Sequence, residues 1–181
     1  MVYILLGTGF EETEAVASYG ILCRGGVKAA FVGVNSNKVK GSHGIEITCD
    51  CGITDIDLNE AEIVVVPGGL RGVKSIKESQ KTMELLKKAS EMGTPLAAIC
   101  AGPTVLAELG IMKNVKACCY PGMESFIPGA DIDNSFMART DGSIITGRSP
   151  GASIHFGLEL LKFLKGEAHA KKIAGEMFYD Y

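Results

Sequence analysis

The sequence predicts an α/β protein in which a mostly parallel sheet is covered by helices on both faces. Short, continuously apolar runs occur at 2–6, 63–66 and 95–99, as is typical of strands that are buried on both faces. Segments with helical spacing of apolar residues lie between these runs, and Gly or Pro marks many of the boundaries. This alternation favours parallel strands that are joined by crossover helices.

Start and stop signals define the elements of the first half. Acidic residues at the start and Gly25-Gly26 at the end predict a helix over 11–23. Turn residues within 35–56 separate short β-like segments and are compatible with a hairpin. Ser75-Ile-Lys-Glu78 resembles a capping box, which predicts one helix from there to about Met92. The strands predicted in this half are 2–6, 27–34 and 63–66.

The second half begins with the stretch PLAAICAGPTVLAELG, in which a buried strand leads directly into a helix. Pro103 suits the first turn of that helix, where no backbone N–H is needed. Residues 121–142 are rich in Gly, Pro, Asp and Asn and are predicted to be irregular. The other elements predicted here are strands at 115–119 and 143–146 and a helix at 153–164.

Composition restricts the class of protein. A chain of 181 residues with 46% hydrophobic and 22% charged residues fits one globular domain spanning 1–181. The net charge of −3 and the lack of a basic block argue against nucleic acid or a membrane surface as partner. No apolar run reaches the roughly 18–20 residues of a membrane span, and 2–6 is too short for a signal peptide. We therefore expect a cytoplasmic protein.

Six cysteines lie mostly within apolar stretches. The spacings Cys49-Asp50-Cys51 and Cys118-Cys119 lack the two intervening residues usual in zinc knuckles, so no metal site is expected. In a reducing compartment most of the six should be free thiols that act as small hydrophobes. Whether Cys49, Cys51, Cys118 and Cys119 fill the core or lie at an interface is left open.

Three loops are predicted to meet at one edge of the sheet, because they follow the carboxyl ends of parallel strands. They carry Glu14, Gly68-Gly69 and Cys100. A side chain on a tight strand-to-helix turn is pushed out of the sheet, as in the nucleophile elbow of hydrolases. The following helix N-terminus would lower the pKa of the Cys100 thiol and make it nucleophilic and easily oxidised.

Simpler interpretations stand beside this one. Cys100 could be a buried core thiol, and Glu14 could belong to an ordinary acidic first turn of a helix. Gly68-Gly69 could be only a turn, and Arg148 only a solvated surface charge.

Four motifs in order, GFEETE, VVVPGG, AAICAGPT and GRSPGAS, resemble the ThiJ/PfpI family, and within it the parkinsonism-associated deglycase branch. The resemblance covers nearly the whole chain. It implies a flavodoxin-like three-layer sandwich and a homodimer. It also implies that Cys100 is a reactive nucleophile, with a protonated Glu14 hydrogen-bonded to its sulfur or to a sulfinate formed by oxidation.

The resemblance implies a pocket around this pair, in which the backbone N–H groups of Gly69 and Ala101 bind an anion. Tyr120 stands where the deglycase branch has a histidine, and Ala101 stands where the protease-like branch has one. Peptidase and amidotransferase chemistry is therefore disfavoured. The other residues that the resemblance places at the pocket or the dimer contact are Gly68, Arg24, Arg148, Pro150 and Gly151.

The function expected from these residues is that of a cysteine enzyme without metal or organic cofactor. It would convert reactive dicarbonyls such as methylglyoxal to hydroxy acids such as lactate, or remove the same adducts from glycated protein side chains. One alternative is an oxidative-stress redox sensor or chaperone with an oxidisable Cys100. A weaker alternative is a cysteine peptidase-like hydrolase. Neither His43, expected at the surface or an interface, nor His155, expected to be half-buried, is taken as a catalytic base.

Overall fold

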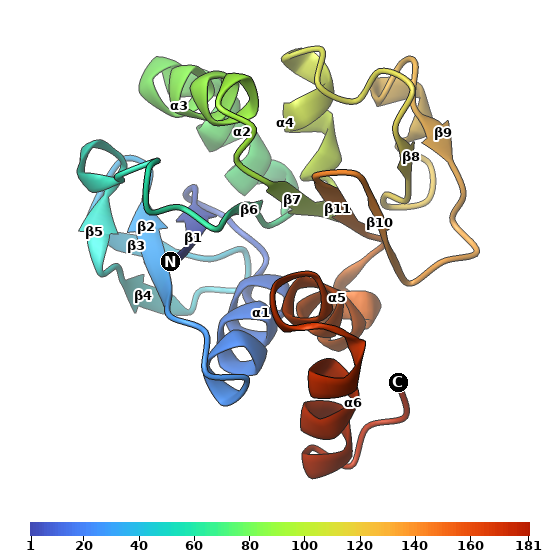
Figure 1. The fold of residues 1–181 in the computed structure, drawn as a ribbon. Helices are drawn as coiled ribbons and strands as arrows, with labels where there is room; N and C mark the ends of the chain where they lie inside the picture. Colours follow the sequence, from blue (N-terminus) through green and yellow to red (C-terminus); the bar gives the residue numbers. More distant parts are fainter.

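The computed structural model describes residues 1–181, and a seven-stranded sheet runs through its centre (Figure 1). Its strands are β1 (Val2–Leu6), β2 (Ala29–Gly33), β5 (Cys51–Gly52), β6 (Ile63–Val66), β7 (Leu96–Ile99), β10 (Ala138–Asp141) and β11 (Ile144–Gly147). Their spatial order is β10-β11-β7-β6-β1-β2-β5, and every pair is parallel except β10 with β11. The prediction of a mostly parallel sheet is confirmed.

Helices cover both faces of this sheet, which gives three layers (Figure 1). On one face lie α1 and α5, which pack against each other, with α6 packed on α5. On the other face lie α2, α3 and α4. The bounds of the helices are α1 (Glu12–Arg24), α2 (Leu70–Glu78), α3 (Gln80–Glu91), α4 (Pro103–Glu108), α5 (Ser153–Lys165) and α6 (Glu167–Glu176). The flavodoxin-like sandwich implied by the resemblance is the observed fold.

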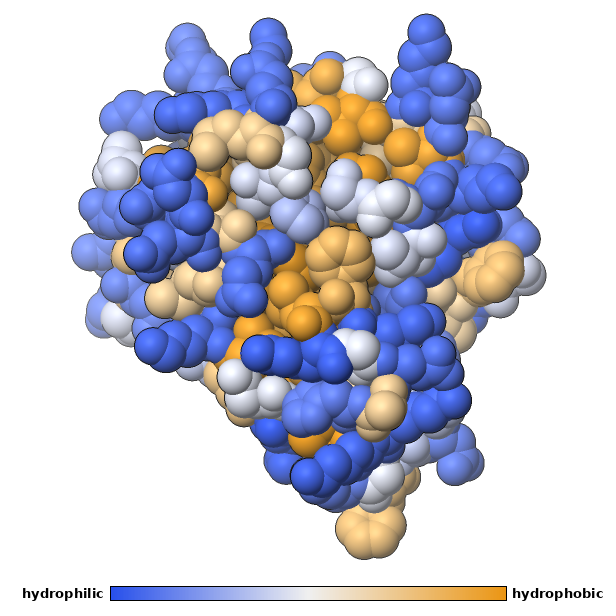
Figure 2. All heavy atoms as spheres, in the orientation of Figure 1, coloured by the Kyte–Doolittle hydropathy of each residue, from blue (hydrophilic) through white to orange (hydrophobic).

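The apolar runs of the sequence form the core because helices cover both faces of the central strands. Every residue of β1, β6 and β7 is buried. The largest buried side chains are Phe10, near the start of the chain, and Phe156, near its end. On the face drawn in Figure 2, hydrophilic residues form most of the rim, while hydrophobic residues gather toward the centre. Burial of apolar side chains is the main favourable contribution to folding.

The strand order reverses beside β1. From β1 the chain passes to its neighbour β2 and then to β5, and it returns to β6 on the other side of β1. In open parallel sheets such a reversal leaves a crevice beyond the carboxyl ends of the two strands, and ligands bind there. The loops after β1, β6, β7 and β11 therefore surround the place where a site is expected.

The helix predicted from Ser75 to Met92 is in fact two helices, with the break at Ser79. Ser79 is the N-cap of α3 and accepts a hydrogen bond from the backbone N–H of Thr82. Ser75 lies inside α2, and its hydroxyl oxygen accepts hydrogen bonds from Thr8 N–H and from the Asn35 side chain. The capping-box prediction was wrong because tertiary partners use the Ser75 hydroxyl.

Three further elements differ from the prediction. The expected strand at 115–119 is reduced to β8 (Lys116–Ala117), which pairs with β9 (Asp131–Ile132) in a separate two-stranded sheet. The region 121–142, expected to be irregular, contains β9, the edge strand β10 and the short 3-10 helix η2 (Glu124–Phe126). Helix α6 was not predicted. The expected hairpin is present as β3 (Lys38–Lys40) and β4 (Glu46–Thr48).

All six cysteines are free, and four of them, Cys49, Cys100, Cys118 and Cys119, are buried. Cys49 and Cys119 belong to the continuous hydrophobic core, and Cys118 packs its sulfur against the carbonyl of Thr146 at 3.4 Å. None of the helices has the length and apolar character that crossing a membrane would require.

Replacement of two helical glycines by alanine is expected to change the free energy of unfolding in opposite directions. A Cβ at Gly72 in α2 would lie 2.6 Å from Cα and 2.7 Å from the backbone N of Phe10, whereas nothing lies within 4 Å of one at Gly20 in α1. We expect Gly72→Ala to lower the free energy of unfolding by about 2–4 kcal/mol and Gly20→Ala to raise it by about 0.5–1 kcal/mol. Urea denaturation measures both. Equal effects of the two substitutions would contradict the packing of α2 on the loop after β1.

Candidate active site

Cys100 occupies a sharp turn between β7 and α4. Its φ of 63° is in the left-handed region, which side chains rarely adopt. The turn is fixed on both sides, because Cys100 N–H donates to Gly147 O (2.9 Å) and Cys100 O accepts from Tyr120 N–H (2.9 Å). A Cβ at Gly102 would collide with the carbonyl oxygen of Val66, so only glycine fits there. The predicted elbow is present, with Pro103 as the first residue of α4.

Glu14 comes from the first turn of α1 and is completely buried. Its Oε2 accepts a hydrogen bond from Gly68 N–H at 2.6 Å, and Oε1 has no nitrogen or oxygen partner. Gly68 O in turn accepts from Glu11 N–H at 3.1 Å, which fixes the start of α1 against this loop. A Cβ at Gly68 would lie 2.7 Å from Glu14 Oε2 and 2.8 Å from Cys100 Cβ. The carboxyl group and the cysteine thus approach each other across a residue that has no side chain.

Burial raises the pKa of Glu14 to about 8, against the lowering effect of the Gly68 hydrogen bond. Near pH 7 this carboxyl is therefore mostly protonated. Burial also raises the pKa of the Cys100 thiol, and a negative charge on Glu14 raises it further. The second contribution disappears when Glu14 holds its proton, so the pair titrates as a unit in which the charge of one group depends on the other.

Two backbone N–H groups act in the opposite direction. The backbone N–H groups of Ala101 and Gly69 favour the thiolate form and lower the pKa of the Cys100 thiol. Gly69 adopts a φ of 85°, and a Cβ there would lie 2.8 Å from the backbone N of Glu11, so a side chain at this position would push the loop away. These donors are arranged as an anion-binding site that needs no charged side chain.

The thiol differs from the prediction in its exposure and its acidity. Cys100 is only 8% exposed, so the residue is largely buried rather than open to solvent. The expected lowering of its pKa by the following helix is outweighed by burial. Helix α4 has only six residues and contributes a weak field, which the sequence pattern alone overestimated.

The other predicted pocket residues follow β8 and β11. Tyr120 lies beside the elbow through its hydrogen bond to Cys100 O, and its side chain is 46% exposed. The Arg148 guanidinium donates to Asn134 O (2.9 Å) and contacts Met137 Sδ, so it holds the segment before β10. Pro150 and Gly151 form the 3-10 helix η3 (Pro150–Ala152) beyond β11, and no hydrogen bond joins them to the Cys100 side chain.

Arg24 is not part of this pocket within one chain. It is the last residue of α1, whereas Glu14 lies in the first turn, so their backbones are about 15 Å apart along the helix axis. Its side chain is exposed at the opposite end of the helix from the thiol. Of the two places that the resemblance implies for Arg24, the pocket is excluded for the same chain, and the dimer contact stays a prediction.

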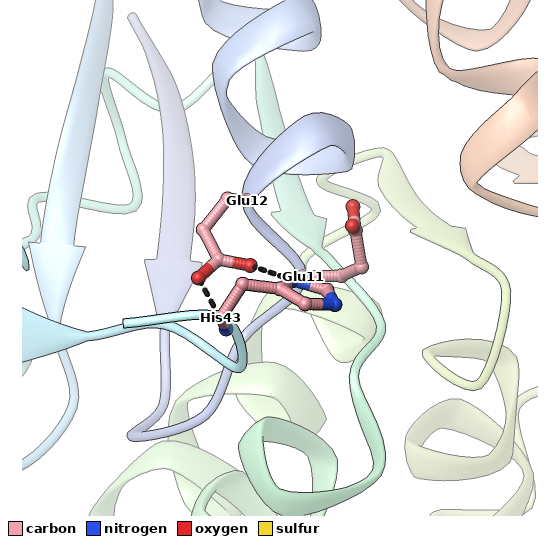
Figure 3. A group of neighbouring side chains, drawn as sticks. All are labelled: Glu11, Glu12 and His43. Atoms are coloured by element: carbon pink, nitrogen blue, oxygen red, sulfur yellow. Dashed lines mark hydrogen bonds and ion pairs between the residues drawn. The ribbon is translucent and has the colours of Figure 1, made fainter. Parts of the chain in front are cut away.

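A second polar cluster, which the sequence analysis did not identify, lies at the start of α1 (Figure 3). Figure 3 shows the Glu12 carboxylate turned toward His43, with 2.7 Å between Oε2 and Nδ1. Glu12 also accepts from the His43 N–H and the Ser42 hydroxyl, and these contacts lower its pKa to about 2 although burial opposes the shift. The exposed His43 has a raised pKa because it bonds to this carboxylate.

The same cluster is the one group of side chains with the spacing of a metal site. Ligand atoms of Glu11, Glu12 and His43 lie within 4.8 Å of one another. The Glu11 carboxylate, however, caps α1 by accepting from Glu14 N–H at 2.8 Å, and both Glu12 oxygens already accept hydrogen bonds. The cluster therefore fastens the turn at residues 41–44 to the start of the helix that carries Glu14. An acidic pair at a helix start, followed by a histidine in a glycine-flanked turn, is the sequence signal for it.

The other two histidines lie away from the thiol. His155 packs against the rings of Tyr179 and Tyr181, and burial lowers its pKa. His169 hydrogen-bonds through Nε2 to Gly25 O at 3.0 Å. None of the three histidines hydrogen-bonds to Cys100, so Glu14 is the titratable group next to the thiol.

Comparisons with known proteins agree with this architecture. A family model described as the DJ-1/PfpI family matches residues 1–163. The chain is 31% identical over 181 residues to Protein dj-1beta of Drosophila melanogaster, which covers 98% of this chain and 96% of the fly protein. A crystal structure of Drosophila melanogaster DJ-1beta superposes with a TM-score of 0.94 at 30% identity, over 99% of this chain and 98% of that chain.

Two similar proteins carry the names of activities. One is the glutathione-independent glyoxalase DJR-1.2 of Caenorhabditis elegans, 30% identical over 158 residues, which are 86% of this chain and 83% of the worm protein. The other is a deglycase of Pyrococcus abyssi, 28% identical over 165 residues, which are 91% of this chain and 99% of that protein. The matched family model, the shared fold and the order of the motifs together place this chain in the DJ-1/PfpI family.

Proposed function

We propose that this chain is a glyoxalase-type enzyme that isomerises and hydrates reactive dicarbonyls, with Cys100 as nucleophile and Glu14 as proton carrier. The observation that carries the proposal is the buried Glu14 carboxyl, whose Oε1 is free of nitrogen and oxygen partners beside the Cys100 thiol. A carboxyl with a pKa of about 8 can both donate and accept a proton near neutral pH. Relatives named glyoxalase and deglycase support the same reaction class.

The proposed reaction needs no external oxidant or reductant. The sulfur attacks the aldehyde carbon of methylglyoxal, a C–S bond forms, and the carbonyl oxygen takes a proton to give a hemithioacetal. Glu14 then moves the proton of that carbon to the neighbouring ketone carbon through an enediol, which leaves a thioester of lactate. The first carbon is oxidised and the second is reduced. Water cleaves the thioester to lactate and returns the thiol.

Negative charge develops on oxygen in the first and last of these steps. The backbone N–H groups of Gly69 and Ala101 are the donors proposed to stabilise it, because they already surround the sulfur. Preorganised donors in a site that excludes water are worth more than the same groups in solution. The same attack on an adduct of a dicarbonyl with a protein side chain would be deglycation.

The proposal is tested by supplying methylglyoxal to the purified protein in D2O without glutathione or metal. We expect lactate with deuterium at its second carbon, because the carboxyl exchanges its proton with solvent before returning it. Failure to form lactate would overturn the proposal. Lactate without deuterium would exclude Glu14 as an exchanging proton carrier and indicate direct hydride transfer between the two carbons.

A redox role is the second proposed function, favoured by the same geometry. Two molecules of peroxide can oxidise the Cys100 thiol to a sulfinic acid with release of two molecules of water. A protonated Glu14 and two backbone N–H groups would stabilise the sulfinate. Mass spectrometry after mild peroxide treatment should find two added oxygens on Cys100 before the other five cysteines react. Equal oxidation of all six would argue against this role.

The proposed assembly is a homodimer and the proposed compartment is the cytoplasm. Sedimentation equilibrium tests the first, with a single mass of one chain as the contradicting result. A peptidase-like function is disfavoured, because the three histidines are all bound elsewhere and Glu14 is the titratable neighbour of the thiol.

A further inference from the structure

An apolar groove lies directly beside the elbow. Its volume is about 250 Å³, and its walls come from α2, from α4 and from the segment at η2. Two of its side chains are among the most exposed large apolar groups of the chain, since Leu70 is 71% and Phe126 is 63% exposed. Val73 and Met123 complete its apolar lining. Neighbouring large apolar groups that are exposed to water commonly mark a binding surface.

The groove is tied to the thiol at two points. Leu70 directly follows Gly69, whose backbone N–H lowers the pKa of the Cys100 thiol. On the other wall, the Thr104 hydroxyl donates to Ala101 O at 2.8 Å, one residue beyond the cysteine. Both walls of the groove therefore belong to segments that also build the turn around Cys100.

The outer wall is held in place. Tyr120 N–H donates to Cys100 O at 2.9 Å, Met123 N–H donates to Tyr120 O at 3.0 Å, and Phe126 N–H donates to Met123 O at 3.0 Å. The Glu124 side chain adds a hydrogen bond from Gly122 N–H at 2.8 Å. Phe126 is thus connected to Cys100 by a chain of backbone hydrogen bonds. Its backbone is therefore held in place although its side chain is exposed.

The charged groups of the groove are paired with one another or with neighbours. Lys74 pairs with Glu78 at 3.7 Å, and Lys77 pairs with Glu108 at 3.0 Å. No unpaired cation remains in the lining to attract an anion. The groove therefore suits a neutral apolar group, and its volume exceeds the roughly 150 Å³ of a cavity that accepts benzene.

We propose that this groove is the specificity subsite for the substituent of the dicarbonyl, and that it favours an aromatic or large apolar substituent over a methyl group. The inference rests on the proposed function, because the reacting carbon must be bound to Cys100. Attack on the aldehyde carbon leaves the ketone carbon and its substituent to extend away from the sulfur, between Leu70 and Phe126. Phenylglyoxal would follow the steps given for methylglyoxal and yield mandelate.

The test compares kcat/KM for phenylglyoxal and methylglyoxal in wild-type protein, Leu70→Asn and Phe126→Ser. We expect the phenylglyoxal to methylglyoxal ratio to fall about tenfold in each variant, mainly through a higher KM for phenylglyoxal, because a phenyl group loses more apolar contact than a methyl group does. Phe178→Ser, at a fully exposed phenylalanine outside the groove, is the matched control and should keep the wild-type ratio. An unchanged ratio in both groove variants would overturn the inference.

A measurement that needs no turnover separates this inference from the proposed function. We expect N-phenylmaleimide to alkylate Cys100 faster than N-methylmaleimide does, relative to the same pair reacting with a free thiol in solution. The excess should fall about tenfold in Leu70→Asn and Phe126→Ser. If neither dicarbonyl is turned over but this excess is present and lost in the variants, the enzyme proposal fails and the apolar subsite stands. Absence of the excess in wild-type protein overturns the subsite.

Discussion

Cys100→Ser is expected to lower lactate formation from methylglyoxal by at least about a thousandfold. A serine hydroxyl at this position would keep the backbone contacts of the elbow, but it stays protonated at neutral pH and attacks aldehydes poorly. The backbone N–H groups of Gly69 and Ala101 cannot compensate, because they stabilise charge only after it has formed. Product analysis of lactate at a fixed protein concentration measures the loss.

Cys23→Ser is the matched control, since Cys23 is exposed and lies near the end of α1, away from Glu14. It should retain the wild-type rate. Retention of more than a tenth of the rate in Cys100→Ser would remove the thiol from the mechanism. Circular dichroism and urea denaturation of both variants would establish that a loss of rate is not a loss of folded protein.

Glu14→Gln is expected to abolish the pH dependence of stability that this buried acid causes. The folded-state pKa of about 8 lies above the value of about 4.5 for an exposed glutamate, so the folded protein binds this proton more tightly than the unfolded chain. The stability that the proton confers is fully present below pH 4.5 and is lost as pH rises to 8. By pH 8 the loss amounts to about 3–5 kcal/mol.

Glutamine resembles the protonated acid, because its carbonyl oxygen can accept from Gly68 N–H and its amide can donate toward the sulfur. The difference in free energy of unfolding between Glu14→Gln and wild type should therefore grow by about 3–5 kcal/mol between pH 5 and pH 8. Urea denaturation at these pH values measures it. Groups such as the Glu12–His43 pair titrate equally in both proteins and cancel in the difference. Parallel stability profiles would show that Glu14 is not a buried acid with a raised pKa.

The same variant should lose activity by about a hundredfold or more, because an amide cannot carry a proton between two carbons. Stability and activity are thus expected to change in opposite directions at one position. A variant that is both less stable and inactive at pH 8 would point to a structural role for Glu14 instead.

The fold was predictable from sequence at the strands that are buried on both faces, because all of their residues must be apolar. The run at 63–66 has no polar residue and forms β6 with the predicted bounds. The prediction failed where tertiary contacts decide. Ser75 has the pattern of a cap but bonds to Thr8 and Asn35, and β10 lies in a region whose composition suggests loops. An edge strand needs only one neighbour, so its apolar pattern is weak.

The sequence predicted which residues form the site better than it predicted their pKa values. The topology correctly brings Glu14, Gly68 and Cys100 to one edge, because loops after parallel strands meet there. The burial of the thiol, and with it the raised pKa, depends on how closely three loops pack, which no local pattern records. The groove beside the elbow was missed for the same reason, since Leu70 and Phe126 are 56 positions apart and look like ordinary apolar residues.

At Cys100 the left-handed backbone conformation sets the stability of the folded protein against the reactivity of the thiol. A side chain in that conformation costs about 1–2 kcal/mol, which glycine would not incur. Mutation to glycine would remove this strain together with the reactive sulfur. Persistence of the thiol in a lineage that must tolerate heat would therefore indicate that the chemistry of the sulfur is under selection in its own right.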